Sequence, residues 1–315
     1  MKTFNLPGTD LNVSNVISGQ MRIADKTDGQ IRELVAVARD AGINLFDHAN
    51  VYGSVDHECE QRFGDALKWT PAQRSEVILQ TKAGIVKTGE DWAYFDFSKA
   101  EIISAVEGSL KALNTDYIDI LLLHRPDALV EPEEVAAAFD ELETLGKVRY
   151  FGVSNQSPRQ IELLKKTVRQ PLVVNQVQLS ITHAPLVAQG LSINMENFEQ
   201  SVVLDGGGLL DYCRLNDITI QAWSPFQRGF FDGTFLGDYE REPKLNKVID
   251  RLAGEYNVEP IGIATAWILR HPANMQVVLG TTTPARVAAA SAASDITLTK
   301  RDWYELAHAA GYVCP

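Results

Sequence analysis

Four polar residues lie at or just after short apolar runs, and their side-chain types suit proton transfer. They are Asp47 and Tyr52 in the segment Phe46–Gly53, Lys82 at the end of Leu79–Lys82, and His124 at the end of Leu121–His124. Each apolar run is typical of a buried strand, so the four side chains are expected near strand ends. A carboxylate, a phenol, an ammonium and an imidazole gathered at one place would transfer a proton to or from a substrate oxygen.

Tyr52 is the expected proton donor. A free phenol has a pKa of about 10 and is a weak acid near neutral pH unless its surroundings change it. A lysine ammonium ~4 Å away can contribute up to about 4 kcal/mol at an effective dielectric constant of about 20, whereas lowering the pKa by about two units needs about 2.7 kcal/mol. We therefore expect Lys82 to lower the pKa of Tyr52 and Asp47 to hold Lys82 charged. His124 would polarise the substrate carbonyl through a second hydrogen bond.

Each of these residues also has a structural alternative. Asp47 could cap the next turn, and Tyr52 could be an aromatic residue on the rim of the barrel. Lys82 could be a solvated charge at a strand end, and His124 a hydrogen-bonded core histidine. Their shared position at strand ends favours the functional interpretation. His48 belongs to no motif and is interpreted as structural.

The order of elements along the chain predicts where these strand ends lie. Strand-like runs alternate with helix-like runs, which implies a parallel sheet, and eight rounds imply its closure into an α/β fold, a (β/α)8 TIM barrel. The carboxyl ends of the strands then open on one face, which holds the active site. The expected strands are Val13–Ser18, Ile43–Phe46, Val77–Thr81, Ile118–Leu123, Tyr150–Val153, Val173–Val177, Thr219–Ala222 and Gln276–Leu279.

Helical periodicity is clear over Gln30–Asp40, Ala100–Leu113 and Glu133–Leu145. Gly42 and Gly146 are placed to end the first and the third of these helices. The side chains expected to face the core are Ile31, Leu34, Val35, Ala38, Ile103, Val106, Leu110, Leu113, Val135, Phe139, Leu142 and Leu145.

A short N-terminal β-hairpin should precede the barrel, because Phe4–Leu6 and Leu11–Val13 flank the turn signal Pro7–Asp10. The length of 315 residues would permit two domains, but barrels of this kind use that much chain as one, so residues 1–315 are predicted to form a single domain. An open doubly wound sheet is the structural alternative. It would normally place G-x-G-x-x-G after its first strand, and the chain lacks that motif.

The composition excludes several other classes of protein. The formal net charge is −12 and no basic stripe is present, which argues against a nucleic-acid partner. No apolar run reaches the roughly 18 residues of a membrane helix. The three scattered cysteines and the absence of a signal-peptide core predict a reducing, cytoplasmic location. No metal site is expected, because His57 and Cys59 would point to different faces of a helix.

Three long connections are expected to leave the carboxyl face and to wall the substrate pocket, namely Gly84–Phe97, Ser180–Gly208 and Phe226–Pro243. Their aromatic residues could line an apolar pocket: Trp92, Tyr94, Phe95, Phe226 and Phe231. Gly206–Gly208 could be a phosphate cradle, but without a preceding strand or a following lysine it is interpreted as a flexible connection into the helix Leu209–Leu215.

The ordered series of motifs resembles the aldo-keto reductase family. Lys82 follows Asp47 by 35 residues and His124 follows Lys82 by 42, which is typical of that family. The resemblance runs from about Gly19 to the C-terminus. It continues through Gly152–Asn155, Asn175–Gln178, Ala222–Pro225 and Gly280–Arg286. The Trp-Ser pair and the tail Gly311–Pro315 are most similar to bacterial NADP-dependent oxidoreductases of the family.

The resemblance implies the same catalytic roles and a nicotinamide dinucleotide lying across the carboxyl face. Ser154, Asn155 and Gln176 match the residues that hold the nicotinamide carboxamide. Trp223 matches the aromatic residue on which the nicotinamide ring stacks. Further contacts to the ring and the pyrophosphate are implied for Gly19, Met21, Arg22 and Ser224.

Arg286, with Thr281 and Gly280, is implied at the adenosine end of the coenzyme. An always-charged guanidinium at a helix start suits the 2′-phosphate of NADP. The chain departs from the family pattern here, because a lysine often stands where Gly280 does and a Glu-Asn pair where Ala289 and Ala290 do. Fewer contacts to the adenosine end are therefore expected.

The leading prediction is an NADPH-dependent reductase of small aldehydes and ketones. A Schiff-base aldolase acting through Lys82 is a second possibility, because Asp47 and Tyr52 would also serve proton transfer there. A cofactor-sensing binding protein with slow turnover is a third. The motifs predict neither the physiological substrate nor the oligomeric state.

Overall fold

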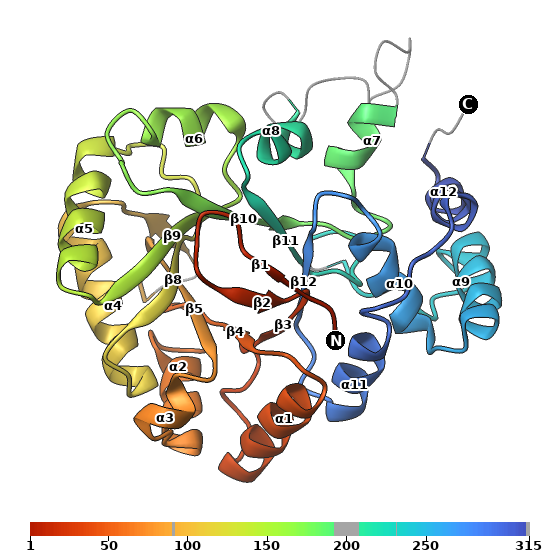
Figure 1. Cartoon of the computed structure of the whole chain (residues 1–315), viewed down its shortest axis with the longest axis horizontal. Helices are drawn as coiled ribbons and strands as arrows, with labels where there is room; N and C mark the ends of the chain where they lie inside the picture. Colours follow the sequence, from red (N-terminus) through yellow and green to blue (C-terminus); the bar gives the residue numbers. More distant parts are fainter. Residues whose placement is uncertain (90–91, 192–207, 231, 313–315) are drawn as a thin grey trace.

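The computed structural model describes residues 1–89, 92–191, 208–230 and 232–312, and its centre is a closed barrel of eight parallel strands in the order β10-β11-β12-β3-β4-β5-β8-β9 (Figure 1). This confirms the predicted (β/α)8 fold. The barrel strands are β3 Val16–Gly19, β4 Leu45–Asp47, β5 Ile78–Ala83, β8 Ile118–Leu123, β9 Val148–Ser154, β10 Leu172–Gln178, β11 Thr219–Trp223 and β12 Gln276–Leu279.

Helices surround the barrel, as Figure 1 shows, and shield the outer faces of its strands. Because the strands are covered on both sides, their burial is nearly continuous, as expected for a parallel sheet. The helices are α1 Asp28–Asp40, α2 Glu58–Leu67, α3 Pro71–Arg74, α4 Lys99–Leu113, α5 Pro132–Thr144, α6 Pro158–Leu164, α7 Pro185–Leu191, α8 Leu209–Leu215, α9 Pro243–Tyr256, α10 Pro260–Leu269, α11 Pro284–Ala292 and α12 Lys300–Ala309.

Local signals set the ends of α1. Thr27 accepts a hydrogen bond from the backbone N–H of Gln30, and the Gln30 side chain accepts one from the Thr27 backbone. Such a capping box typically stabilises a helix by about 1 kcal/mol, and it starts α1 ahead of the predicted Gln30. After the helix, Gly42 adopts a φ of +87°, which glycine tolerates without strain.

One predicted core position is wrong. In α4, Val106, Leu110 and Leu113 are buried as predicted, Ile103 is partly buried and packs against the core, and Ile102 is fully buried as well. Leu145 is 58% exposed, because α5 ends at Thr144 and Leu145 is its C-cap. Beyond the cap, Gly146 turns the chain with a φ of +68°.

The predicted N-terminal hairpin is present as β1 Thr3–Asn5 paired with β2 Asn12–Ser14. The expected strand Val13–Ser18 is therefore wrong as a single element, because its first part belongs to the hairpin and only Val16–Gly19 enters the barrel. The chain changes sheets at Asn15, whose Nδ2 donates to the carbonyl of Ser294 at 3.0 Å.

The hairpin closes one end of the barrel interior. Its apolar side chains join those that point inward from the barrel strands in one buried cluster. The buried members of this cluster are Leu6, Leu11, Val13, Ile17, Leu45, Ile78, Ile120, Leu122, Val173, Val174 and Val278. A larger cluster fills the space between the strands and the helices. The opposite end of the interior, at the strands' carboxyl ends, is polar, and the candidate site lies there.

The long connections carry more structure than expected. Gly84–Phe97 contains an antiparallel hairpin, β6 Ile85–Lys87 with β7 Ala93–Phe95. Phe226–Pro243 is held by the bridge between Gln227 and Thr234. Ser180–Gly208 begins with the bridge between Ser180 and His183 and continues into α7. Its residues 192–207, which include Gly206 and Gly207, lie outside the described chain, and so does Phe231. Gly208, with a φ of +83°, leads into α8, which spans the predicted helix Leu209–Leu215.

Among the described residues, no helix is long and apolar enough to cross a membrane. The same residues contain no group of histidine, cysteine and acidic side chains arranged to hold a metal ion. Cys59 and Cys213 are buried, Cys59 Sγ donates to the carbonyl of Met21 at 3.6 Å, and Cys314 lies outside the described chain.

Candidate active site

A cavity of about 1160 Å³, here called the main cleft, opens at the carboxyl ends of the barrel strands. All the residues predicted for catalysis or coenzyme binding line it except Lys82, which lies behind Asp47 and Tyr52 with 1% of its surface exposed. The predicted residues that line it are Gly19, Met21, Arg22, Asp47, Tyr52, His124, Ser154, Asn155, Gln176, Trp223, Ser224, Gly280, Thr281 and Arg286. Residues from distant parts of the chain therefore share one cleft, as predicted.

Lys82 is the centre of the polar cluster at the base of this cleft. Its Nζ donates to Asp47 Oδ1 at 2.8 Å and Oδ2 at 2.7 Å, to the carbonyl of His48 at 2.7 Å and to the Tyr52 hydroxyl at 3.1 Å. An ammonium has three protons, so these acceptors satisfy it completely. Because the Tyr52 oxygen accepts from Lys82, its own proton remains free to be donated into the cleft.

The electrostatics of this pair oppose a Schiff-base role. Burial alone would lower the pKa of Lys82, but the Asp47 carboxylate and Tyr52 outweigh it, so the pKa of Lys82 lies above its ordinary value. A Schiff-base lysine must instead be available as a neutral amine. Lys82 is charged, enclosed and fully hydrogen-bonded, which disfavours the aldolase alternative.

Burial raises the pKa of Tyr52, and Lys82 acts in the opposite direction without cancelling it. Lys82 thus lowers the pKa of Tyr52, as expected. The prediction that this pKa lies below its ordinary value is wrong for the protein without coenzyme or substrate, because burial has the larger effect. The phenol is protonated at neutral pH, which is the form that a proton donor requires.

His124 lies beside Tyr52, with ring centroids 5.9 Å apart in an edge-to-face arrangement. Burial, Lys82 and Arg125 lower the pKa of His124 well below its ordinary value, so its ring is neutral near pH 7. A neutral imidazole carries one N–H and can donate one hydrogen bond to a substrate oxygen in the cleft. His48, by contrast, is fully buried and packs edge-to-face on Phe63, which fits its structural interpretation.

A ladder of buried glutamines supports Asp47 and was not predicted from the sequence. Gln80 Nε2 donates to Asp47 Oδ1 at 2.6 Å, and Gln176 Nε2 donates to the same oxygen at 3.0 Å. Gln221 joins these two to Gln276, whose Nε2 donates to the carbonyl of Ser14 at 2.7 Å. The available signal was a glutamine in each of four predicted buried strands, where a buried amide needs partners.

The residues expected at the nicotinamide are hydrogen-bonded to one another. Ser154 Oγ donates to the carbonyl of Gln176 at 2.8 Å, and Asn155 Nδ2 donates to Ser154 Oγ at 2.8 Å. Trp223 Nε1 donates to Asn155 Oδ1 at 3.1 Å, which fixes the plane of the indole. Asn155 and Ser224 adopt φ values of +58° and +52°, so the ends of β9 and β11 turn sharply at the cleft.

Gln176 has its Nε2 committed to Asp47 and Gln221. Its Oε1 is therefore the atom left to accept a hydrogen bond from a carboxamide NH₂ group.

The far end of the cleft is formed by β12 and the start of α11. Arg22 Nη1 donates to the carbonyl of Gly280 at 3.4 Å, which ties the loop after β3 to this end. Arg286 stands in the first turn of α11, where its backbone N–H donates to the carbonyl of Thr283 at 3.0 Å, and its guanidinium makes no hydrogen bond or ion pair with the described part of the chain. The N-cap Thr283 gives α11 no side-chain hydrogen bond. A free guanidinium beside an uncapped helix start suits a phosphate.

The aromatic wall of the cleft differs from the prediction. Phe226 lines it, whereas Trp92, Tyr94 and Phe95 are 58%, 45% and 42% exposed on the β6–β7 hairpin and do not. Phe230 and Arg125 line the cleft and were not predicted. Arg125 directly follows His124 in the chain, and this adjacency was the signal available in the sequence.

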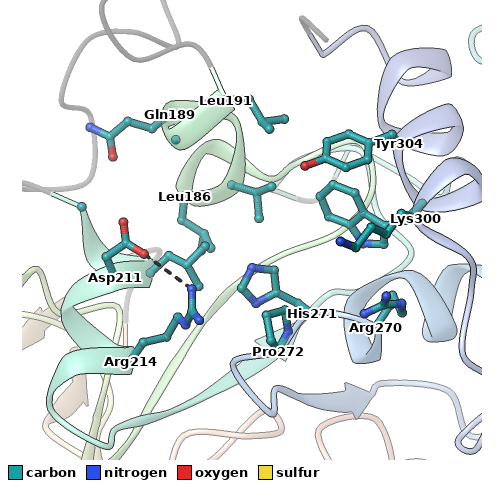
Figure 2. Close-up of a pocket in the computed structure, with 15 residues that line it drawn as sticks. Leu186, Gln189, Leu191, Asp211, Arg214, Arg270, His271, Pro272, Lys300 and Tyr304 are labelled. Atoms are coloured by element: carbon teal, nitrogen blue, oxygen red, sulfur yellow. Dashed lines mark ion pairs between the residues drawn. The ribbon is translucent and has the colours of Figure 1, made fainter.

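A second cavity, of about 650 Å³, lies between α7, α8 and α12 (Figure 2). None of the predicted site residues lines it. Its polar residues include the ion pair Arg214–Asp211, with 3.9 Å between Nη1 and Oδ1, and His271, whose pKa burial and Arg214 lower to about 4. Leu191 and Gly208, which border the undescribed residues 192–207, form part of its wall, and we assign it no ligand.

A sequence model of the aldo/keto reductase family matches residues 15–310 of this chain. The chain belongs to the aldo/keto reductase family. Membership makes it an oxidoreductase that uses a nicotinamide coenzyme and acts on small carbonyl compounds. The predicted family resemblance is therefore confirmed.

Individual aldo/keto reductase relatives cover nearly the whole chain. The uncharacterized oxidoreductase YcsN of Bacillus subtilis (strain 168) is 35% identical over 97% of both chains. The 6-dehydroglucose reductase of Agrobacterium fabrum is 32% identical over 94% of both. The structure of the glycerol dehydrogenase AKR11B4 from Gluconobacter oxydans has a TM-score of 0.75 at 24% identity, over 98% of this chain and 94% of that chain, and shows the shared fold.

Gln80→Leu tests the glutamine ladder. Removing the amide takes a hydrogen bond from the Asp47 carboxylate and leaves Gln221 short of a partner, so the free energy of unfolding should fall by about 1.5–3 kcal/mol. Urea unfolding would measure it. Gln61→Leu, on the exposed side of α2, is the control and should change stability by less than about 0.5 kcal/mol. Equal small changes in both variants would show that the ladder adds no stability.

Proposed function

We propose that this aldo-keto reductase uses NADPH to reduce the carbonyl group of small aldehydes or ketones to alcohols, with Tyr52 as the proton donor. The observation that carries the proposal is the 3.1 Å hydrogen bond from Lys82 Nζ to the Tyr52 hydroxyl. It orients the phenol and leaves its proton directed to the cleft. When bound, the coenzyme supplies the hydride, which no side chain here can supply.

The side chains then act on the substrate oxygen. Tyr52 donates its proton as negative charge develops there, and the Lys82 ammonium stabilises the phenolate that Tyr52 becomes. His124 donates a second hydrogen bond to the same oxygen and polarises the carbonyl. Asp47 touches no substrate in this proposal, and it keeps Lys82 charged and in place.

The coenzyme site in the proposal follows the residues of the main cleft. Ser154, Asn155 and Gln176 hold the carboxamide, and Trp223 offers its indole face to the nicotinamide ring. Gly19, Met21, Arg22 and Ser224 contact the middle of the coenzyme. A side chain at Gly19 would not fit, since an added Cβ would lie 2.7 Å from the carbonyl oxygen of Leu279.

The preference for NADPH rests on the adenosine end. The guanidinium of Arg286 has no partner within the described residues, so its charge is available to the 2′-phosphate. Thr281 adds a hydroxyl. Gly280 leaves its side of the cleft open, since a Cβ added there would meet no described atom within 4 Å apart from its chain neighbours. The proposal includes one catalytic barrel domain over residues 1–315. It also places the enzyme in the cytoplasm, in keeping with the buried thiol of Cys59, which forms no disulfide among the described residues.

Tyr52→Phe should remove the proton donor and leave the cleft otherwise unchanged. We expect kcat for aldehyde reduction to fall at least about 100-fold, in line with general-acid contributions, with little change in NADPH affinity. Steady-state NADPH oxidation and fluorescence titration measure the two quantities. Tyr304→Phe, on the exposed side of α12, is the control. A Tyr52→Phe enzyme as fast as the wild type would refute the assignment.

Lys82→Met keeps the volume of the side chain and removes its charge. Because Lys82 is the group that lowers the pKa of Tyr52, its loss should raise that pKa further. Reduction needs the protonated phenol, so the decline of kcat at high pH should move to higher pH while the rate falls. The pH profile of kcat measures both. An unchanged profile, or a substrate adduct on Lys82 trapped by borohydride, would contradict this role.

Arg286→Ala tests the coenzyme preference. A charge-assisted contact to a phosphate is worth roughly 1.5–3 kcal/mol, so NADPH affinity should fall about 10- to 150-fold while NADH affinity stays nearly constant. Quenching of tryptophan fluorescence reports both affinities, because Trp223 stacks on the nicotinamide in the proposal. Arg159→Ala, on the exposed face of α6, is the control. An equal loss for both coenzymes, or none, would place the phosphate elsewhere.

A further inference from the structure

Arg125 is a charged residue of the main cleft that the proposed reaction does not use. It follows His124 directly, is partly buried and lines the cleft. The central carbon of its guanidinium lies 5.5 Å from the centroid of the Trp223 ring and 5.8 Å from that of Phe230. Cation–π contacts of this kind hold the charge in place and leave the N–H donors of the guanidinium available.

Within the described residues, no carboxylate pairs with Arg125 and no hydrogen bond engages it. Asp127 is the nearest acidic residue in the chain, but its oxygens accept from the backbone N–H groups of Phe97 at 3.0 Å and Leu129 at 2.8 Å. Arg228, which also lies near the cleft, is paired with Asp232 and Asp238. Arg125 is thus a partly buried cation that lacks a counter-charge, and burial lowers its pKa. Such a charge gains most from an anion that enters the cleft.

Arg125 acts at the reacting end of the cleft. The charge of Arg125 contributes to the lowered pKa of His124. Burial lowers the pKa of Arg125, and Tyr52 acts in the opposite direction. The geometry agrees, because Arg125 directly follows His124 and its guanidinium lies 5.5 Å from the centroid of the Trp223 ring. Arg286 stands in the first turn of α11, after β12, and is assigned to the coenzyme phosphate, so the two arginines have different ligands.

We propose that Arg125 binds an anionic group of the substrate, a carboxylate or a phosphate, and that the preferred substrates are aldehydes or ketones that carry such a group. The inference rests on the proposed function, because it concerns the substrate of that same site. A guanidinium presents a planar fork of donors that matches both kinds of oxyanion. The contacts with Trp223 and Phe230 orient this fork.

Two matched substrate pairs test the inference with purified enzyme and NADPH. In each pair one member is charged, namely 4-oxobutanoate against butanal and glyceraldehyde 3-phosphate against glyceraldehyde. The wild type should have the higher kcat/KM for the charged member of at least one pair, and that pair identifies the carboxylate or the phosphate. A wild type that favours the neutral member of both pairs overturns the inference while leaving the proposed function intact.

Arg125→Gln removes the charge and keeps hydrogen-bonding capacity. The ratio of kcat/KM for the charged member to that for the neutral member should fall about 10- to 150-fold, mainly through KM, and Arg125→Lys should restore part of it. Arg159→Gln on α6 is the control and should leave both ratios unchanged. If Arg125→Gln lowers both members equally, Arg125 only supports Trp223 and Phe230, and the inference is wrong.

A measurement on the wild type keeps the test independent of the variant's folding. Butanoate should inhibit the reduction of butanal competitively, and butanamide, its neutral counterpart of similar shape, should not. If the phosphate pair is the preferred one, inorganic phosphate should inhibit the same reaction. Equal inhibition by butanoate and butanamide, together with none by phosphate, refutes the inference. If the wild type reduces none of the four carbonyl compounds, the proposed function itself fails and this inference falls with it.

Discussion

The buried ion pair between Lys82 and Asp47 constrains both the fold and the chemistry of this enzyme. With 1% and 2% of their surfaces exposed, neither charge can be solvated, so each depends on the other and on the polar groups around it. Removing one partner of such a pair typically costs about 3–5 kcal/mol. Asp47 pairs in register with Gln80 across β4 and β5, and Lys82 lies two residues further along β5. The register between β4 and β5 in the barrel is therefore also the register that brings Lys82 and Asp47 into contact.

The side chains inside the barrel change from apolar to polar along its axis, because the buried charges of Lys82 and Asp47 need polar partners at one end. Near the N-terminal hairpin the inward side chains are apolar, such as Ile17, Leu45 and Ile120. At the other end, Gln176, Gln221 and Gln276 are matched in register across β10, β11 and β12 and are joined by hydrogen bonds, and Gln176 donates to Asp47. Buried amides are costly unless they are paired, and a ladder of mutual partners meets that condition. The apolar end provides hydrophobic stabilisation, and the polar end positions the groups that we propose for catalysis.

Patterns that are local in the sequence predicted most of the fold, and residues whose role depends on distant partners were missed. Alternation of elements and the spacing of Asp47, Lys82 and His124 were enough for the barrel and for the cluster at its carboxyl end. The division of Val13–Ser18 between the hairpin and the barrel was not predictable from its apolar pattern, because Asn15, where the chain changes sheets, has its side-chain hydrogen-bond partner 279 positions away at Ser294. Leu145 was misplaced because periodicity continues through a helix end that only the cap geometry marks. Gln80 and Gln221 were missed because they are 141 positions apart in the sequence and meet only in the closed barrel.

The balance of effects on Tyr52 bears on the direction of proton transfer. Burial raises its pKa, and Lys82 offsets only part of that rise. At neutral pH the phenol therefore carries its proton and can give it to a developing alkoxide, whereas alcohol oxidation needs the scarcer phenolate as a base. The lowered pKa of His124 keeps that ring neutral over the same range, so it can donate a hydrogen bond without adding a competing charge. Burial thus keeps Tyr52 protonated and His124 neutral, the states that the proposed carbonyl reduction requires, and in that proposal the charge on Lys82 limits the cost of the phenolate that forms.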